Sequence, residues 1–451
     1  MTVVTRDRTR TSVAPALVAR VVLVAAVAIN LAIVWTLFFT EHAPQKNTLV
    51  TIGRFLGLHV ALIMILQLVL IARLPWLDRR IGMDRLTSWH RRVGFTLLWT
   101  VILHLSFIIT GYARFDRIPV LREALNLAGA TGTLVGMLAV AIIVVAVAFS
   151  IRAARRRLQY ETWHSIHLLL YAAVILALLH QLYEGSTFKT SLAAQIYWWA
   201  LWAFAIGALI AGRLVVPLWS NSRHRLRVAA VVPESDNTVS VYMTGKRLDQ
   251  LRARPGQFFL WRFLGHNRWW QVNPFSLSAA PDGRSLRLTA KGIGTTSAGL
   301  RSVPIGTRVF AEGPYGAFTT MHRTKTDTVL IAGGVGVTPI RSLLEDPELT
   351  GDIVVLYRVH TAADAVLLGE LENLATTRGA RLHLLTGRTG TGSPPNNPFS
   401  PESLSRLVPD IADRDVFVCG PGPMTDAVLR SLRALRVPGR QVHAERFRLA
   451  A

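Results

Sequence analysis

Six long apolar runs constrain the fold of this chain more than any other feature. Each run is long enough to cross a lipid bilayer as a helix. The runs lie at residues 17–39, 52–74, 89–110, 131–150, 164–183 and 193–216. The hydrophobic share of 51% over 451 residues agrees with a large membrane-embedded part. We therefore predict an all-α bundle of six membrane-spanning helices over residues 1–218.

Arginine is concentrated in alternate connections between these runs. The net charge is +23, but no nucleic-acid-binding motif accompanies it, so we assign the charge to lipid contact and to topology. The connections 74–92 and 151–163 are rich in arginine, whereas 40–51 and 184–192 each carry one lysine. Because cytoplasmic loops carry excess Lys and Arg, we expect a multi-pass cell-membrane protein. Its N-terminus and everything after about residue 217 would then be cytoplasmic.

The pattern changes after the sixth run. Short alternating strands at 225–232, 238–244 and 285–290 are separated by turn residues, which predicts an antiparallel β-barrel over 219–324. Further on, the apolar strands "TVLIAG", "DIVVLYR", "RLHLLT" and "DVFVCG" alternate with helix-like stretches. That alternation is typical of a parallel α/β sheet, which we predict over 325–451.

Four histidines occupy matched positions in the third and fifth apolar runs. His90 and His104 lie 14 residues apart, which puts both on one face of a helix, and His167 and His180 lie 13 apart. An imidazole in hydrocarbon is costly and marks a functional site by default, although it can also hydrogen-bond a neighbouring helix. Because the two helices run parallel, His90 can face His167 and His104 can face His180. The pattern predicts two stacked bis-histidine haem sites.

The spacing of the second pair is imperfect on an ideal helix. Thirteen steps leave the two rings about 140° apart, so we expect a kink or π-bulge between Leu168 and Leu179. His164 offers no better angle and lies near the membrane surface. The one cysteine, Cys419, excludes a disulfide within the chain and an iron–sulfur cluster held by four thiolates.

These histidine segments carry a family resemblance. "WHRRVGFTLLWTVILH" and "YETWHSIHLLLYAAVILALLH" resemble the third and fifth helices of the ferric reductase and NADPH oxidase superfamily, and "ARLPWLDRRIGMDRL" resembles its bacterial members. The resemblance implies two b-type haems with the ligands His90, His104, His167 and His180. His164 would then be interfacial. His59 would be structural or serve the outer haem or acceptor, and Arg54 would meet haem propionates or substrate, or reach the membrane interface.

"NPFSLSAAP" at 273–281 lies between "RPGQFFLWRF" and "LTAKGIGTTSAGL" and resembles the flavin-binding domain of the ferredoxin–NADP reductase superfamily. The resemblance implies that Phe275 packs beside the flavin and that the Ser276 hydroxyl bonds its reactive nitrogen, a catalytic contact. It also implies an FAD diphosphate site with added charge from Lys291. The loop residues of that site are Gly292, Gly294, Thr295, Thr296 and Ser297. Where the family usually has His or Arg, this chain has Asn273. The cationic contact with FAD would then have to come from Arg262 or Arg268.

"VLIAGGVGVTPIRSLL" predicts a strand, a glycine turn and a helix. Gly333, Gly334 and Gly336 let the backbone approach a phosphate, and a helix N-terminus favours the anion. We expect Thr338 to cap that helix and Pro339 to fill its first position. The third glycine of G-x-G-x-x-G is absent.

"FVCGPGPM" matches the same family's nicotinamide-side motif through Cys419, Gly420 and Pro421. The motif stands at the carboxyl end of a strand, where open α/β sheets bind ligands. We interpret Cys419 as a catalytic cofactor contact, with a buried structural thiol as the alternative.

Two arginines bear on the choice of nicotinamide nucleotide. Arg358 and Arg388 follow the second and third strands of the predicted parallel sheet and can hold the 2′-phosphate of NADPH, whereas an acidic residue there would favour NADH. We therefore expect NADPH, with NADH as the alternative. In the closing "HAERF", Phe447 either covers the flavin or packs in the core.

The resemblance covers roughly residues 20–447 and implies an electron path. NAD(P)H would reduce FAD, and electrons would pass to the inner haem and then to the outer haem before reaching an extracytoplasmic acceptor. The favoured extracytoplasmic acceptor is ferric iron or another metal chelate. The alternatives are a superoxide-generating NADPH oxidase and an electron supply for a periplasmic redox partner. A non-redox transporter is disfavoured, since transporters use broken helices rather than a reductase tail.

Overall fold

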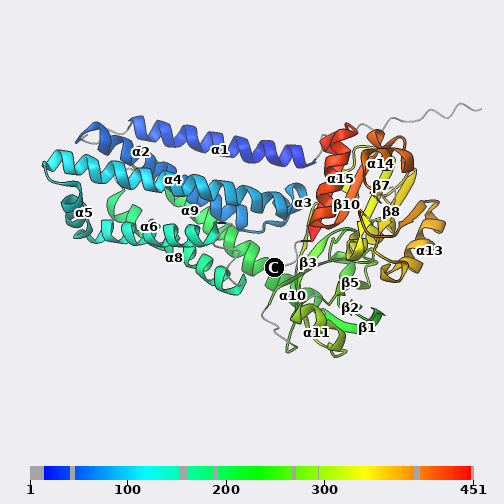
Figure 1. The fold of residues 1–451 in the computed structure, drawn as a ribbon. Coiled ribbons are helices and arrows are strands. Elements are labelled where there is room, and N and C mark those ends of the chain that lie inside the picture. The colour runs from blue at the N-terminus through cyan, green and yellow to red at the C-terminus, as the bar shows by residue number, and fades with distance from the viewer. Residues whose placement is uncertain are drawn as a thin grey trace, which may run out of the picture. The chain divides into compact units, whose positions relative to one another are not determined.

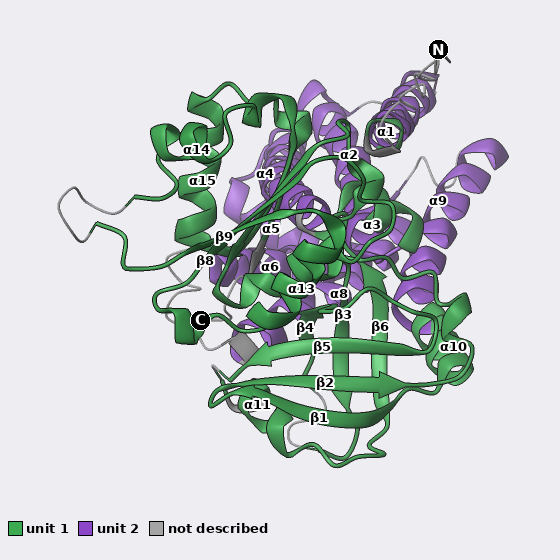
Figure 2. Cartoon of the chain, turned by 90° about the vertical axis from the view of Figure 1, so that its right-hand side faces the viewer, with its two compact units in different colours: residues 1–19, 75–83, 215–449 green, residues 20–74, 84–214, 450–451 purple. Residues whose placement is uncertain are grey.

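The computed structural model describes residues 15–40, 46–151, 160–185, 191–266, 271–292, 294–390 and 397–447. Its elements divide into two compact units (Figures 1 and 2). The helical unit contains residues 20–74 and 84–214. The reductase unit contains residues 75–83 and 215–449, together with the first 19 residues.

Within the described residues, six helices are long and apolar enough to cross a membrane, which agrees with the six predicted spans. They are α1 (Pro15–Thr40), α2 (Thr48–Ile71), α4 (Met83–Asp116), α6 (Thr131–Ser150), α8 (Tyr160–Glu184) and α9 (Leu192–Ile210). The sixth span continues through a π-helical turn, η2 (Ala211–Val215), into α10 (Val216–His224). A short helix, α5 (Val120–Ala128), precedes α6.

The expected irregularity in the fifth span is wrong. α8 runs as an unbroken α-helix through both Leu168 and Leu179, so side-chain rotamers and helix crossing must absorb the angle between the two histidines. The irregular turn lies instead in the sixth span, at η2. There Arg213 donates from Nε to the carbonyl of Ile71 at 2.9 Å.

α2 is the most enclosed of the six spans. Of its most apolar stretch 44% is buried, against 28% or less in each of the others. Trp198 and Trp202 of α9 are almost fully buried in the same core. By contrast, Trp99 of α4 and Ile175 of α8 point outward and are more than half exposed. Apolar side chains on the outside are what a lipid environment accepts.

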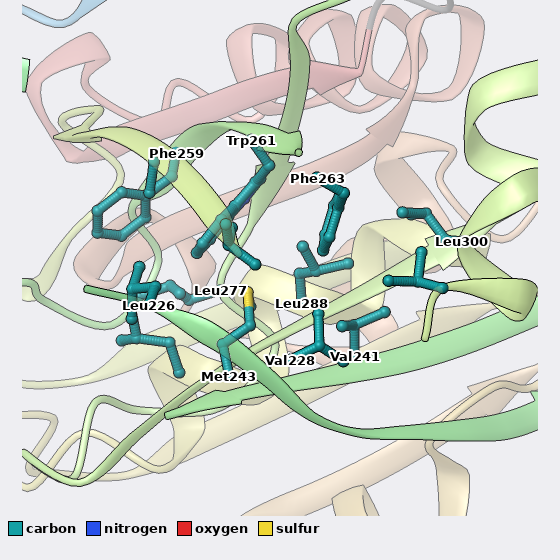
Figure 3. Packing of buried hydrophobic residues seen from close by; sticks show 14 of the residues in the cluster. Leu226, Val228, Val241, Met243, Phe259, Trp261, Phe263, Leu277, Leu288 and Leu300 are labelled. Atoms are coloured by element: carbon teal, nitrogen blue, oxygen red, sulfur yellow. The ribbon is translucent and has the colours of Figure 1, made fainter. Parts of the chain in front are cut away.

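The reductase unit begins with two three-stranded antiparallel sheets. One sheet has the order β1 (Arg227–Ser235), β2 (Thr238–Thr244), β5 (Ser285–Lys291), and the other β4 (Asn273–Ser276), β3 (Phe258–Phe263), β6 (Val309–Tyr315). Two isolated bridges join these sheets: Arg227 of β1 bridges Arg308, just before β6, and Leu288 of β5 bridges Leu277, just after β4. The antiparallel strands of the predicted barrel are thus present, and they form two three-stranded sheets joined by isolated bridges. Figure 3 shows Met243, Trp261 and Leu288 in the apolar core that they enclose.

The second part of the reductase unit is a five-stranded parallel sheet. Its strand order is β11 (Val442–Phe447), β10 (Asp415–Pro421), β7 (Thr328–Gly333), β8 (Ile353–Arg358), β9 (Arg381–Leu385). The chain moves outward from β7 to β8 and β9, then returns to place β10 on the other side of β7. The strand order therefore reverses between β7 and β10, and open sheets bind ligands at such a switch point.

The connection between the second and third spans belongs to the reductase unit. Its short helix, α3 (Pro75–Ile81), packs on β6. The Oδ2 atom of Asp78 accepts from the Gly316 amide at 2.9 Å, and the Nε2 atom of His322 donates to the Arg79 carbonyl at 3.1 Å. These two polar contacts therefore hold this loop against the segment that follows β6.

Candidate redox centre

The structure brings the four predicted histidines together in two facing pairs. α4 supplies His90 and His104, and α8 supplies His167 and His180. The ring centres of His90 and His167 lie 6.1 Å apart with the rings inclined at 77°. Those of His104 and His180 lie 6.5 Å apart at 67°. Each pair thus brings two imidazoles, and with them two possible nitrogen ligands, close together.

Both separations fit a metal ion between the rings. With metal–nitrogen bonds of about 2.0–2.1 Å and about 1.1 Å from nitrogen to ring centre, opposed imidazoles stand about 6.3 Å apart. Within the described residues no group of three or more His, Cys, Asp or Glu could hold a bare ion. Haem iron needs only two axial ligands from the protein. The donor set therefore fits haem.

The outer pair, His104 and His180, is oriented by main-chain carbonyls. The Nδ1 atom of His104 lies 2.7 Å from the oxygen of Gly53 on α2. The Nδ1 atom of His180 lies 2.9 Å from the oxygen of Gly132 on α6. Because a carbonyl only accepts, each Nδ1 carries the proton and each Nε2 keeps its lone pair for a metal.

Two further glycines make room for the same rings. A Cβ atom on Gly57 would stand 2.9 Å from Cε1 of His104, and one on Gly136 would stand 2.6 Å from Nδ1 of His180. Gly53, Gly57, Gly132 and Gly136 thus all border the two outer imidazoles. Sequence reasoning missed them, although "GRFLG" and "GTLVG" are G-x-x-x-G steps in apolar runs, a signal of close helix approach.

The inner pair, His90 and His167, has a different surrounding. The Nδ1 atom of His167 lies 3.4 Å from the Ser150 hydroxyl, which also accepts from the indole of Trp163 at 3.2 Å. The Trp163 ring stacks on His167 at 5.2 Å. Among the described residues, the buried Nδ1 of His90 has no hydrogen-bond partner. The described surroundings of the inner pair therefore include a hydroxyl and a stacked indole.

The two other membrane histidines take separate places. His164 is exposed next to Trp163. Both ring nitrogens of His59 are engaged, since Nε2 accepts from the Trp35 indole at 3.0 Å and Nδ1 donates to the Phe55 carbonyl at 2.8 Å. These bonds favour the structural interpretation of His59.

The flavin-side motif contains a buried hydroxyl, that of Ser276, without a hydrogen-bond partner among the described residues. Ser276 ends β4 with its side chain 3% exposed. A buried hydroxyl without a partner is costly, and a flavin nitrogen would satisfy it. Phe275, beside it, is partly buried. The residues present therefore fit a flavin.

Arg262 and Arg268 are the two residues predicted to supply the cationic flavin contact that Asn273 lacks, and the structure describes one of them. Arg262 pairs with Glu312 of β6 and covers the Phe310 ring, so its guanidinium is engaged within the sheet. Arg268 lies outside the described residues. The Asn273 amide donates to the Gln271 carbonyl at 3.4 Å.

The glycine-rich loop after β5 leads into a short helix, α11 (Thr295–Gly299). The amide of Gly292 is already used, since it donates to the Asn237 carbonyl at 2.7 Å. The Gly294 amide donates to the Ser297 hydroxyl at 3.1 Å, and no atom lies within 4 Å of where its Cβ would be. Lys291 is exposed. The side chains of Thr295 and Thr296 lie outside the described residues.

The nicotinamide-side motifs meet where β7 and β10 end. A Cβ atom on Gly420 would stand 3.1 Å from the Cα of Gly333, and one on Gly336 would stand 2.6 Å from the carbonyl carbon of Cys419. These three positions are therefore small because two strands approach closely. Gly334 differs. Its φ is +52°, and no atom of the described residues beyond its chain neighbours lies within 4 Å of where its Cβ would be, which leaves room for a ligand above its backbone.

Cys419 and its neighbours complete this edge. The thiol is fully buried, and Cys419 pairs in register with Glu445 of β11. Sequence reasoning did not single out Glu445, whose place beside Cys419 depends on the parallel pairing of β10 and β11. Pro421 is exposed. The side chain of Phe447 lies outside the described residues.

The predicted start of the helix after β7 is wrong. α12 covers Val337–Leu344, and Gly336 is its N-cap. Thr338 is inside the helix and donates its hydroxyl to the Val335 carbonyl at 3.1 Å. Pro339 is the third helical residue rather than the first. The reason is that a 3-10 turn, η6 (Gly334–Gly336), leads straight into the helix.

The two candidate 2′-phosphate arginines differ. Arg358 ends β8 and is buried, and it donates to the carbonyls of Leu385 and Thr386 and to the Thr389 hydroxyl at 3.3, 2.6 and 3.4 Å. Burial lowers the pKa of this guanidinium. Arg358 therefore orders the loop after β9. Arg388, in that loop, is exposed.

A charged cluster ties the two parts of the reductase unit together. Arg287 of β5, 4% exposed, donates to both carboxylate oxygens of Glu370 at 2.8 and 3.0 Å. Glu370 lies on α13 (Leu368–Arg378) beside the parallel sheet and also pairs with Arg341 of α12 at 2.8 Å. Burial alone would lower the pKa of Arg287, but Glu370 outweighs it and raises that pKa. Burial alone would raise the pKa of Glu370, but the two arginines lower it.

Comparison with known proteins bears on the whole chain. A family profile described as "Ferric reductase like transmembrane component" matches residues 56–178. Profiles described as "FAD-binding domain" and "Oxidoreductase NAD-binding domain" match residues 223–319 and 330–430. These three parts in this order are those of one superfamily.

The chain belongs to the ferric reductase and NADPH oxidase superfamily.

Curated relatives of this superfamily member cover its reductase half. The ferredoxin reductase component of a 3-ketosteroid-9-alpha-monooxygenase from Mycobacterium tuberculosis is 31% identical over 242 residues, 49% of this chain and 65% of the relative. The glycine betaine monooxygenase reductase subunit of Chromohalobacter salexigens is 26% identical over 241 residues, 51% of this chain and 65% of the relative. The chain thus spans less than two thirds of these relatives.

Solved structures align with about half of this chain. The FAD/NAD-binding domain of nitric oxide dioxygenase from Vibrio cholerae is 23% identical with a TM-score of 0.39, covering 50% of this chain and 99% of that one. The ferredoxin NADP+ reductase of Neisseria gonorrhoeae, solved with FAD and NADP, is 18% identical with a TM-score of 0.42, covering 49% and 97%. The family matches and the six apolar helices describe a multi-pass membrane oxidoreductase with FAD-binding and NAD-binding domains.

Proposed function

We propose that this protein moves electrons from NAD(P)H through FAD and two b-type haems to an acceptor across the membrane, first of all a ferric chelate. The observation that carries the proposal is the pair of facing imidazole sets on α4 and α8, at separations that suit haem iron. Its second support is the Ser276 hydroxyl, buried without a partner among the described residues.

The residues of the chain have distinct tasks in this proposal. FAD supplies the exchange of a hydride for single electrons, and haem supplies one-electron transfer. The carbonyls of Gly53 and Gly132 accept from Nδ1 of the outer imidazoles, which leaves Nε2 of His104 and His180 as the atoms that would bind a haem iron. Ser276 donates its hydroxyl to the flavin edge. Gly334 and the N-terminus of α12 receive a nucleotide phosphate.

The proposed topology has support within the reductase unit. α3 lies in the arginine-rich connection 74–92, and Asp78 and Arg79 bind this helix to the sheet that carries the flavin motif. A loop packed on the reductase unit must lie on the same side of the membrane as that unit. We therefore keep that loop, the N-terminus and the reductase unit in the cytoplasm.

The curated relatives are reductase components of monooxygenase systems. In this chain the corresponding half is joined to six apolar helices that carry two histidine pairs. We therefore propose that electrons leave the flavin for the helical unit. Oxygen, as in a superoxide-generating oxidase, and a periplasmic redox protein are the alternative final acceptors.

A haem assay on purified protein tests the proposal. In nanodiscs with FAD, the reduced-minus-oxidised spectrum should show b-type bands, and a pyridine haemochrome assay should give two haems per chain. NADPH should reduce these haems without oxygen. His167→Ala should lose one haem and His164→Ala should keep both. A wild-type protein without haem bands would overturn the proposal.

The acceptor assay follows haem reduction. Ferric citrate, supplied on the side away from the reductase unit, should reoxidise the haems and yield ferrous iron in the presence of superoxide dismutase. A signal that superoxide dismutase abolishes would support the oxidase alternative instead.

A further inference from the structure

A cavity lined by cations opens at one end of the helical unit. Its volume is about 410 Å³, within the range of small-ligand sites. We call it the cation pocket. Its lining residues are Lys46, Asn47, Thr48, Leu49, Arg114, Phe115 and Arg117. They lie in the two residues before α2 and its first turn, and at the end of α4 with the residue after it.

The walls of the cation pocket are held by short contacts between these two helices. Asn47 caps α2 by accepting from the Val50 amide at 3.0 Å, and its side-chain amide donates to the Gly111 carbonyl of α4 at 2.7 Å. A Cβ atom on Gly111 would stand 2.8 Å from the Val50 nitrogen. The two helix ends are therefore in direct contact here, and they form the floor of an open, shallow site.

The charge of the described lining has one sign. Lys46, Arg114 and Arg117 line the cation pocket, and none of its seven lining residues that the structure describes is acidic. Asp116 is exposed next to them without being part of the lining. The Lys46 ammonium lies 4.3 Å from the centre of the Tyr112 ring, which holds it by a cation–π contact. The occupant that this lining favours is an anion.

The cation pocket stands at the end of the bundle nearer the outer histidine pair. Arg114 lies ten residues beyond His104 on α4, a rise of about 15 Å. Gly53, which orients His104, lies six residues after Asn47 on α2, about 9 Å. Within the proposed function, the pair at this end delivers the electron to the acceptor.

We propose that the cation pocket binds the carboxylate shell of an anionic ferric chelate and so selects the acceptor. This inference rests on the proposed function. Carboxylates match arginine in paired, charge-assisted hydrogen bonds. The redox balance is simple, since one NAD(P)H supplies two electrons, reduces two Fe(III) chelates to Fe(II) and leaves NAD(P)+ and one proton. No bond to the chelate forms or breaks in the transfer itself.

Binding is tested without electron transfer. Gallium(III) citrate is a redox-inert probe, and its affinity for the haem-loaded protein in phosphatidylcholine nanodiscs can be measured by calorimetry. Arg114→Gln with Arg117→Gln should raise its Kd about tenfold, because two charge-assisted contacts are lost. Lys46→Gln alone should raise it less. Arg122→Gln, an exposed position on α5 outside the lining, should leave it unchanged. Equal affinity in wild type and double variant overturns the inference.

Kinetics then separate this inference from the proposed function. In the double variant the KM for ferric citrate should rise about tenfold, while reduction of the cationic acceptor hexaammineruthenium(III) should not slow. An equal loss with both acceptors overturns the pocket, because a general defect would explain it. Wild-type protein that binds gallium citrate but reduces neither acceptor leaves the pocket standing and overturns the proposed function.

A lipid headgroup is the other anionic source at such a site. Nanodiscs that contain phosphatidylglycerol separate the two sources. If this lipid raises the wild-type Kd for gallium citrate to that of the double variant, the pocket belongs to lipid and the inference is overturned. An unchanged wild-type Kd supports the chelate.

Discussion

The imidazole of His180 lies so close to Gly136 that a Cβ atom on this glycine would stand 2.6 Å from Nδ1. His104 and Gly57 repeat the relationship at 2.9 Å on the neighbouring helices. In both cases the glycine four residues earlier, Gly132 or Gly53, accepts from Nδ1 of the same ring. Each outer imidazole therefore has a carbonyl that orients it and a glycine that makes space for it.

Gly136→Ala should displace the His180 ring and remove the outer haem. A methyl group at 2.6 Å from a ring atom must push the ring away, and the ring is backed by a packed helix. We expect haem content to fall from two per chain towards one in a pyridine haemochrome assay. Gly207→Ala is the matched control, because Gly207 lies in α9 with nothing within 4 Å. Full haem content in Gly136→Ala would contradict this role of Gly136.

Ser276→Ala should change the stability of the reductase unit in opposite directions without and with bound FAD. Without FAD, removal of a buried hydroxyl that lacks a partner should stabilise the reductase unit by about 1 kcal/mol. With FAD, a hydrogen bond is lost and the FAD-dependent rise in Tm should shrink. Thermal unfolding of the full chain with and without added FAD measures both.

Ser278→Ala provides the contrast to this variant. Its hydroxyl already accepts from Arg287 at 3.0 Å and from the Thr289 hydroxyl at 2.7 Å. Its loss should lower Tm in both flavin states. The same behaviour from Ser276→Ala would argue against a flavin contact.

Glu370→Gln should destabilise the reductase unit at neutral pH by about 1–2 kcal/mol, after allowance for the partial exposure of this carboxylate. The arginines lower the folded-state pKa of Glu370. Its contribution is therefore fully present above the unfolded-state pKa of about 4.3 and is lost as pH falls through the lower folded-state value. Urea unfolding of the full chain, followed by FAD fluorescence, measures the free energy of unfolding.

The pH profile distinguishes this cause from a packing defect. The difference between wild type and Glu370→Gln should stay constant from about pH 6 to 8 and shrink below about pH 4. A difference that persists unchanged at low pH would mean that charge is not responsible. Arg406→Gln, at an exposed position on α14 (Pro401–Leu407), should leave stability unchanged throughout.

Arg388→Ala should separate NADPH from NADH. If the exposed Arg388 meets the 2′-phosphate, the KM for NADPH should rise about tenfold while that for NADH stays nearly constant. Steady-state reduction of ferric citrate with each nucleotide measures this, and Arg406→Ala is the control. Arg358→Ala should instead raise both values, because Arg358 orders the loop after β9 through three hydrogen bonds. Equal rises in Arg388→Ala would exclude its proposed selectivity.

Local patterns in the sequence account for the elements of this fold. Apolar length predicts the six spans, and alternation predicts strands such as β2 and β5, because both depend on the period of the backbone itself. The glycine turn "GGVGVTP" follows β7 as the sequence predicts, but the helix after it begins at Val337. A 3-10 turn that merges with a helix leaves no mark in the hydrophobic pattern, so the cap was misassigned.

The sequence alone determined that His90, His104, His167 and His180 are unusual, because imidazoles stand inside long apolar runs. It also determined that the flavin and nucleotide motifs follow these runs in order. Only the tertiary structure decided what surrounds them. His104 meets Gly53 across 51 residues, and His180 meets Gly132 across 48. Such contacts depend on how helices pack, and packing follows from side-chain shape over the whole bundle rather than from a local period. For the same reason, only the fold could bring Lys46 beside Arg114 and Asp78 beside Gly316.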